Sequence, residues 1–210
     1  VLIEDNETSR SQVEHGIYVS NSGDRPIIRN NHSWGNRANG IHMNGDVSLG
    51  GDGIISGALV ERNLIHDNGS GGGSGINCDG VQGSRFVNNV LYNNHAGGIT
   101  LYRIDAGGSA INNLVAHNTI LQASDGRWAV NITNASTGNR VVNNILYNPN
   151  YRQFDVEGYR IYRGRVDAPN ELTLLAQYDY TGTQIDDFTG TVNAAKDCAP
   201  ELGVLTSCPT

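Results

Sequence analysis

Short runs of alternating apolar and polar residues recur along the chain, and most of them begin with the same dipeptide. Gly-Ile opens the runs at 16–20, 40–44, 75–79 and 98–102, and a variant of the pattern occupies 129–133. Successive side chains of a strand point to opposite faces, so a period of two predicts strands with one buried face. A second unit, built around asparagine, alternates with the first. Its anchor residues are Asn31, Asn63, Asn89, Asn118 and Asn144.

The spacing of the units predicts how the strands are arranged. The asparagine anchors follow one another at intervals of 32, 26, 29 and 26 residues. Short strands at this period are typical of a solenoid of stacked coils, in which turn asparagines form ladders from coil to coil. We therefore predict an all-β fold, a right-handed parallel β-helix of about six to eight coils. A β-sandwich is the rival interpretation, but it does not require the same residue at the same place in each unit.

Composition and charge narrow the classes of protein. The chain has 27 glycines and 26 asparagines in 210 residues, which excludes a helical bundle. The net charge is −7 and the chain lacks a basic stripe, so we expect no nucleic-acid partner. No apolar stretch approaches the ~18 residues of a membrane span, so we expect no membrane insertion. The sequence opens within the pattern and without Met, and we take it as a mature or truncated piece of a longer chain.

The repeat pattern divides the chain into two regions, and the cysteines indicate where in or outside the cell the protein is found. We expect residues 1–150 to form the coils and residues 151–210 to form a last irregular coil and a C-terminal cap of the same domain. Cys198 and Cys208 lie close together in the tail, where a disulfide would fit a secreted or extracellular protein; two free thiols are the alternative. Cys78 falls in an inward position, so we interpret it as a core thiol and not a nucleophile.

Two sequence motifs resemble a known superfamily. The patterns G-I-x-[VLIMC] and [VI]-x-N-N-[VI]-[IL]-x-N, the latter at 87–93 and 142–148, resemble pectin-lyase-like parallel β-helix repeats over roughly residues 13–150. The resemblance implies the fold, but that superfamily includes lyases, epimerases, hydrolases and non-enzymatic adhesins. The run Asn77-Cys78-Asp79-Gly80 is similar to the first aspartate motif of polygalacturonases, whose other motifs are absent. The catalytic lysine of the lyase families is also absent, since Lys196 in the tail is the only lysine.

Alignment of the coils separates the expected core from the expected surface. The inward columns are Ile17, Ile41, Ile76, Ile99, Val130 and Val19, Met43, Cys78, Leu101, Ile132. The outward columns are Tyr18, His42, Asn77, Thr100, Asn131 and Ser20, Asn44, Asp79, Tyr102, Thr133. The insertions 45–52 and 104–109 directly follow the outward columns, and such loops usually line the binding face of a solenoid. We expect a groove there that suits a linear polysaccharide.

The chemistry of the outward residues predicts two classes of function. Elimination or epimerisation at a uronate needs a cation for the carboxylate, a base for the C5 proton and an acid at the leaving oxygen. Arg103, His42 and Tyr102 are the candidate catalytic residues for these three roles. The candidate substrate-binding residues are Tyr18, Asn44, Asn77 and Asp79. The protein is then an extracellular enzyme acting on acidic polysaccharide by β-elimination or epimerisation; the alternative is a non-catalytic carbohydrate-binding or cell-surface module.

Each candidate residue also has a structural interpretation. His42 can be an exposed strand residue, Tyr102 a packing residue, and Arg103 the partner of Asp79 or Asp105 in an ion pair. We interpret His15, which precedes Gly16, as structural. Asp46, Asp52 and Asp79 are candidate ligands for calcium, a possible cofactor, although the sequence has no known calcium-loop motif.

Overall fold

The computed structural model describes residues 1–149, 158–163 and 173–179. The chain divides into two compact units, Val1–Asn150 and Tyr151–Thr210. In the second unit the described strands β20 (Gly158–Arg163) and β21 (Thr173–Asp179) pair in antiparallel fashion. The predicted cap lies mostly outside the described residues, and the predicted Cys198–Cys208 disulfide lies wholly outside them.

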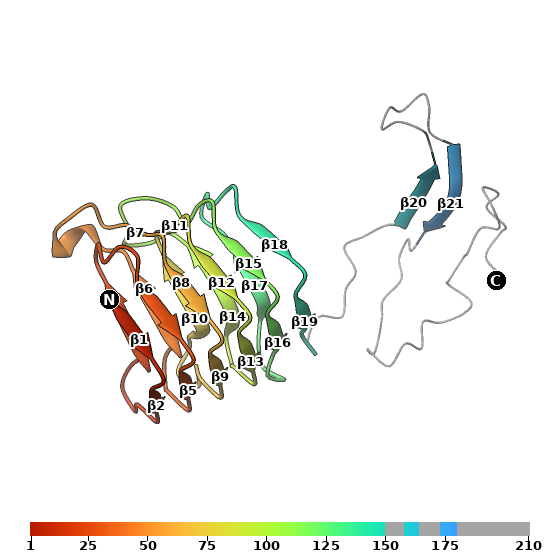
Figure 1. The fold of residues 1–210 in the computed structure, drawn as a ribbon. Helices are drawn as coiled ribbons and strands as arrows, with labels where there is room; N and C mark the ends of the chain where they lie inside the picture. Colours follow the sequence, from red (N-terminus) through yellow and green to blue (C-terminus); the bar gives the residue numbers. More distant parts are fainter. Residues whose placement is uncertain (150–157, 164–172, 180–210) are drawn as a thin grey trace. The chain divides into compact units, whose positions relative to one another are not determined.

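The first unit is a stack of about six coils in which strands of successive coils lie side by side (Figure 1). Sheet I runs β1 (Leu2–Glu4), β4 (Ile27–Arg29), β8 (Leu59–Glu61), β12 (Arg85–Val87), β15 (Leu114–Ala116) and β18 (Arg140–Val142). Sheet II runs β2 (Glu7–Ser9), β5 (His32–Trp34), β9 (Leu64–His66), β13 (Val90–Tyr92), β16 (Thr119–Leu121) and β19 (Ile145–Tyr147). Sheet III runs β3 (Ile17–Ser20), β6 (Ile41–Asn44), β10 (Ser74–Asp79), β14 (Gly97–Tyr102) and β17 (Trp128–Ile132).

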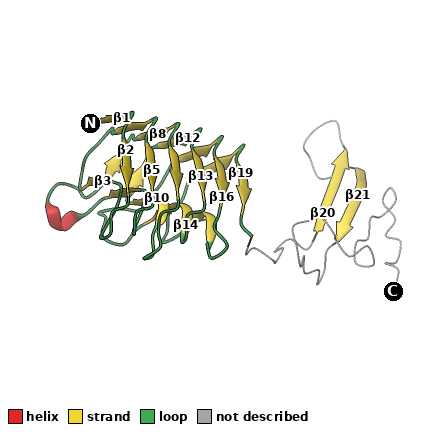
Figure 2. Cartoon of the chain, turned by 90° about the horizontal axis from the view of Figure 1, so that it is seen from below, coloured by secondary structure: helices red, strands yellow, loops and turns green. Residues whose placement is uncertain are grey.

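All three sheets are parallel, and each full coil contributes one strand to each of them, as the view from below also shows (Figure 2). The insertions add a short parallel pair, β7 (Ile55–Ser56) with β11 (Val81–Gln82), and one turn of 3-10 helix, η1 (Val47–Leu49). The predicted all-β parallel solenoid is therefore confirmed. No helix in the described part of the chain is long and apolar enough to cross a membrane.

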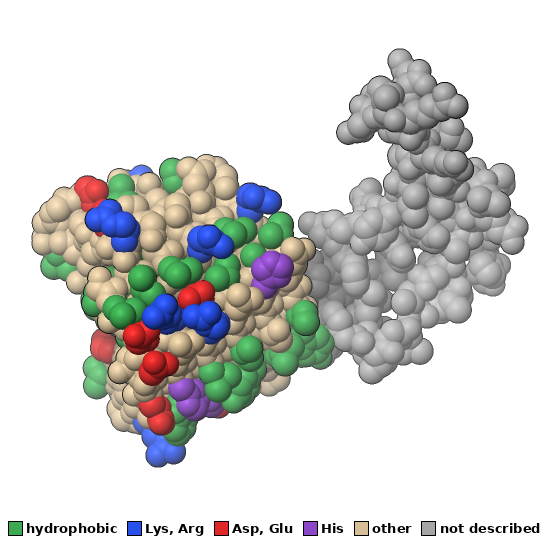
Figure 3. Space-filling view, in the orientation of Figure 1, with side chains coloured by type: hydrophobic (Ala, Val, Ile, Leu, Met, Phe, Trp, Pro, Cys, Tyr) green, Lys and Arg blue, Asp and Glu red, His purple; other side chains and the backbone are tan. Residues whose placement is uncertain are grey.

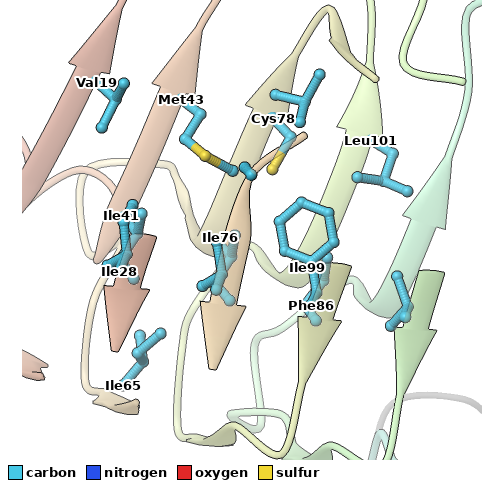
Figure 4. Close-up of a cluster of buried hydrophobic side chains, with 14 of the residues drawn as sticks. Val19, Ile28, Ile41, Met43, Ile65, Ile76, Cys78, Phe86, Ile99 and Leu101 are labelled. Atoms are coloured by element: carbon cyan, nitrogen blue, oxygen red, sulfur yellow. The ribbon is translucent and has the colours of Figure 1, made fainter. Parts of the chain in front are cut away.

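The inward columns form one continuous hydrophobic core. In sheet III, Ile41 pairs with Ile76 and Ile76 with Ile99, while Met43, Cys78 and Leu101 align in the same way. These six side chains are fully buried, and Figure 4 shows them in rows along neighbouring strands. Ile132 departs from the prediction because it lies on the last strand of the sheet, and it is 37% exposed.

The predicted asparagine ladder runs through the corner between sheets I and II. Amide Nδ2 of Asn31 donates to Oδ1 of Asn63 (3.0 Å), and the same bond joins each anchor to the next as far as Asn144. The ladder asparagines do not themselves carry the left-handed backbone. That conformation falls on the residue before each one, for example Asn30 (φ 54°) and Asn88 (φ 57°).

The glycine of the Gly-Ile unit is required by close packing between sheets. A Cβ atom on Gly40 would lie 2.6 Å from Cγ2 of Ile65, and one on Gly75 would lie 2.8 Å from Cδ2 of Leu91. Real Cβ atoms do not approach other atoms so closely. The glycine therefore lets the start of each sheet III strand lie against the buried side chains of sheet II.

Candidate functional site

Four of the predicted site residues, Tyr18, His42, Asn77 and Tyr102, line two separate hollows on the outer face of sheet III. The first, which we call the histidine hollow, has a volume of about 450 Å³ and is lined by Glu14, His15, Tyr18 and His42. The second, which we call the tyrosine–tryptophan hollow, has a volume of about 290 Å³. Its lining includes Asn77, Thr100, Tyr102, Arg127, Trp128 and Asn131. The catalytic candidates His42 and Tyr102 thus belong to different hollows.

The histidine hollow is built from three rings that contact one another. His15 stacks on Tyr18 with 5.4 Å between ring centroids, and His42 meets both rings edge-on at 4.5 and 5.3 Å. Tyr18 is 48% exposed, and its hydroxyl accepts a hydrogen bond from Nδ2 of Asn44 (3.2 Å). We predicted that Asn44 faces solvent and binds substrate, but the residue is buried. Its amide instead positions the phenol of Tyr18.

Hydrogen bonds fix the tautomers of the two imidazoles. His15 Nδ1 accepts the backbone N–H of Asn39 (3.2 Å), so the proton of neutral His15 is on Nε2. That Nε2–H donates to Nδ1 of His42 (3.0 Å), which leaves the proton of His42 on its own Nε2. This last nitrogen is buried and has no hydrogen-bond partner among the residues that the structure describes. The lone pair that a general base needs is therefore occupied on His42.

Burial also weakens His42 as a base. Loss of solvent and the neighbouring His15 lower the pKa of His42 to about 4, and burial lowers the pKa of His15 as well. Both rings are thus neutral at neutral pH. The predicted role of His42 as the base for C5 proton abstraction requires a rotation of its ring that frees Nδ1 from His15.

The tyrosine–tryptophan hollow combines exposed aromatic surface with amide and guanidinium groups. Trp128 is 44% exposed, and the guanidinium carbon of Arg127 lies 5.5 Å from the centroid of its ring. Nδ2 of Asn77 donates to the hydroxyl of Tyr102 (2.8 Å), which leaves the phenol proton free for another partner. Burial and the nearby Asp79 raise the pKa of Tyr102, so its phenol is a weak acid.

Asp79 does not face solvent, contrary to the prediction. The residue is only 1% exposed, and its two carboxylate oxygens accept the backbone N–H groups of Ile104 (2.9 Å) and Asp105 (2.8 Å). The insertion 104–109 therefore folds back over Asp79. Burial raises the pKa of this carboxyl, and the donated hydrogen bonds oppose that shift. Asp79 anchors the loop instead of contacting a ligand.

The two insertions, which we expected to line a groove, lie against each other. The backbone N–H of Val47 donates to the carbonyl of Asp105 (3.4 Å), and that of Gly107 donates to the carbonyl of Gly53 (3.0 Å). Arg103 is exposed, and its Nε donates to the carbonyl of Ala106 (3.2 Å). Among the described residues it forms no ion pair with Asp79 or Asp105.

The candidate calcium ligands serve as turn and cap residues. Asp46 accepts hydrogen bonds from the backbone N–H (2.8 Å) and hydroxyl (2.6 Å) of Ser48 at the start of η1. Asp52 accepts the backbone N–H of Ile54 (3.0 Å). In the described part of the chain no three His, Cys, Asp or Glu side chains are grouped so that they could hold a metal ion. The structure therefore does not assemble Asp46, Asp52 and Asp79 into a calcium site.

Three residues of the two hollows were missed from the sequence. His15, interpreted as structural, lines the histidine hollow and contacts His42 directly. Arg127 and Trp128 were overlooked because they directly precede the aligned repeat, which begins at Ala129. The sequence does contain a signal, since Arg127 and Trp128 place a cation next to the largest aromatic side chain directly before the repeat at 129–133.

A stack of parallel coils with an asparagine ladder at a corner defines a parallel β-helix protein. Polar and aromatic side chains cover the outer face of its sheet III. A family model described as the right-handed β-helix region matches residues 1–162. The chain therefore belongs to the right-handed β-helix family, and the resemblance to pectin-lyase-like repeats is confirmed at the level of the fold. Comparisons with curated proteins and with solved structures find no match.

Proposed function

We propose that the protein binds an acidic, uronate-containing polysaccharide along the outer face of sheet III. Membership of the β-helix family supports a polysaccharide-related or surface β-helix protein and no finer function. The finer proposal is carried by one observation, the exposed ring of Trp128 beside Arg127 in the tyrosine–tryptophan hollow. Large exposed aromatic surface in a hollow is typical of a binding site.

The lining of this hollow matches the chemistry of such a polymer. An aromatic ring offers an apolar face to the C–H groups of a sugar ring. The amides of Asn77 and Asn131 can exchange hydrogen bonds with sugar hydroxyls, since each amide is both donor and acceptor. The guanidinium of Arg127 presents paired N–H donors to a carboxylate. Uronate polymers of this kind occur outside cells, so the proposal includes a secreted or extracellular location.

Affinity gel electrophoresis over a panel of uronate and neutral polymers tests the proposal. We expect retention on a uronate polymer, with affinity reduced about tenfold or more by Trp128→Ala or Arg127→Ala. Arg127→Ala should spare binding to any neutral polymer, because it removes only the contact to the carboxylate. Tyr147→Ala is the matched control, since Tyr147 is a 41% exposed aromatic residue on sheet II. Unchanged binding by Trp128→Ala would show that this hollow is not the site.

Turnover of the bound polymer by β-elimination or epimerisation is a second candidate function. The observation that supports it is the grouping of two imidazoles and the phenol of Tyr18 on the same sheet face, where His42 can take up a proton once its ring turns away from His15. The ultraviolet absorbance of new unsaturated ends tests elimination, and NMR of the polymer tests epimerisation. If the parent has either activity, His42→Ala should abolish it while the melting temperature stays within a few degrees. Activity retained in that variant excludes His42 as the base.

A further inference from the structure

A second group of rings lies on the outer face of sheet II, away from both hollows. His66 is held between Trp34 and Tyr92, with ring centroids 6.0 and 4.4 Å apart and interplanar angles of 10° and 7°. His32 lies beside this stack, 5.0 Å from His66. Along the lower edge of Figure 3, where Figure 1 places β5 and β9, imidazole and hydrophobic side chains lie together.

The two imidazoles point the same nitrogen atom at each other. Nε2 of His32 lies 2.8 Å from Nε2 of His66, so one proton is shared between two ring nitrogens. Nδ1–H of His66 donates to Oδ2 of Asp67 (2.6 Å), which places the lone pair of neutral His66 on Nε2, facing His32. A hydrogen bond donated by the far ring nitrogen to a carboxylate is also the arrangement that orients imidazole ligands in metal sites.

We propose that His32 and His66 form a binding site for a divalent transition-metal ion of tetragonal preference, Cu²⁺ first, with Asp67 as the positioning residue for His66. The ion binds both Nε2 atoms from one side of the line that joins them, because the 2.8 Å between the two atoms is too short to hold an ion. The Nε2 proton of His32 leaves to solvent and His32 takes up one proton on Nδ1, so the neutral pair changes tautomer with no net release of protons. Water completes the coordination, and the metal keeps its oxidation state.

The separation of the two nitrogens selects the geometry. Metal–nitrogen bonds of about 2.0–2.1 Å put two imidazole nitrogens about 2.9 Å apart at a right angle and about 3.3 Å apart at a tetrahedral angle. The observed 2.8 Å is close to the first value. Right-angled nitrogen ligands suit Cu²⁺ and Ni²⁺, and Cu²⁺ is also the most strongly bound of the divalent first-row ions. Zn²⁺ needs the rings to move farther apart and is expected to bind more weakly.

The surroundings hold the site in this arrangement before any ion arrives. His66 is confined between two rings, and its side chain is 12% exposed. The amide of Asn93 donates to Oδ1 of Asp67, so both oxygens of the orienting carboxylate are engaged. Asp67 itself occupies a left-handed corner position (φ 56°) that fixes its direction relative to the strand. A ligand restrained as His66 is loses little freedom on binding.

Quenching of Trp34 fluorescence by Cu²⁺ tests the proposal, because the ring centroid of Trp34 lies about 6 Å from both imidazoles. The untagged full chain carrying Trp128→Phe leaves Trp34 as the only tryptophan. We expect saturable quenching at one Cu²⁺ per chain, reversed by EDTA, with weaker binding of Ni²⁺ and still weaker binding of Zn²⁺ in competition. Affinity should fall as pH drops, because protons compete for the same nitrogens.

Variants separate a built site from unspecific binding. His32→Gln and His66→Gln should each abolish the saturable phase, and Asp67→Asn should weaken binding roughly 10–100-fold, as loss of an orienting carboxylate does. His95→Gln is the matched control, since His95 also pairs with a carboxylate, Asp125 (2.9 Å), but contacts no second imidazole. Circular dichroism checks that each variant is folded. Equal saturable quenching in folded His32→Gln, or none in the parent, overturns the proposal.

Discussion

Each ladder asparagine satisfies the polar groups of a buried corner. Oδ1 of Asn89 accepts both the backbone N–H (3.0 Å) and the side-chain amide (2.9 Å) of Asn63. Its Nδ2 donates to the carbonyl of Val60 (3.0 Å) and to Oδ1 of Asn118 (3.0 Å). One side chain thus joins three coils, and polar groups that would otherwise be buried without partners are paired.

Removing one rung should therefore be costly. Asn89→Ala breaks these four hydrogen bonds and leaves the buried N–H of Asn63 unpaired, so we expect a loss of about 2–4 kcal/mol in the free energy of unfolding. Chemical denaturation measures it. The control is Asn88→Gly at the neighbouring exposed position, whose positive φ suits glycine, so its effect should stay within about 1 kcal/mol. Equal losses in the two variants would contradict the structural role of the ladder.

The neutral imidazole of His42 makes stability depend on pH. In the unfolded chain a histidine has a pKa near ~6.5, whereas burial lowers the pKa of folded His42 to about 4. Between these values the unfolded state binds more protons, so the folded state loses stability as pH falls from about 6.5 to 4. We expect this loss to reach up to about 3 kcal/mol and to shrink in His42→Gln. Thermal melts across this range measure it, and identical pH profiles would contradict a buried neutral His42.

At the scale of the strand, alternation predicted the fold and part of the site. The two-residue alternation predicted that Ile76 and Ile99 face the core and that Tyr18 faces solvent, because successive side chains of a strand point to opposite faces. It failed for Asp79, because the loop 104–109 folds over that side chain and loop paths carry no period. It also gave no signal for the contact between His15 and His42, which joins a turn to a strand of the next coil.

The inward column of sheet II offers a comparison within one residue type. Leu91 and Leu146 both pair with Ile120, but Leu91 is fully buried whereas Leu146, on the last strand of sheet II, is 45% exposed. We expect Leu91→Ala to cost about 2–5 kcal/mol and Leu146→Ala at most about half as much, because only the first leaves a closed cavity. Urea titrations of both variants decide the point. A larger cost at Leu146 would mean that the core does not end where the structure places it.

At the scale of the whole solenoid, stability depends on how many neighbours a coil has. Within residues 1–149 the central strands pair on both sides, whereas β18 and β19 pair on one side only. Such a stack is approximately a sum of coil and interface contributions, so its ends open more readily than its middle. We expect amide hydrogen exchange to be slowest in β10 and β13 and about tenfold or more faster in β18 and β19. Uniform protection along the stack would argue for a single all-or-none unit.

The ladder is made of identical asparagines, so it cannot determine which coils become neighbours. Because every rung from Asn31 to Asn144 is the same amide, a coil that skipped a neighbour during folding would find an equally good partner waiting. The ladder stabilises the contact between coils but does not specify their order. The order has to come from core side chains that differ from coil to coil in size and shape, such as Met43, Cys78 and Phe86. Replacing those three residues by one residue type would keep the ladder but remove the differences that specify the order of the coils. We therefore expect wrongly ordered stacks and not an unfolded chain.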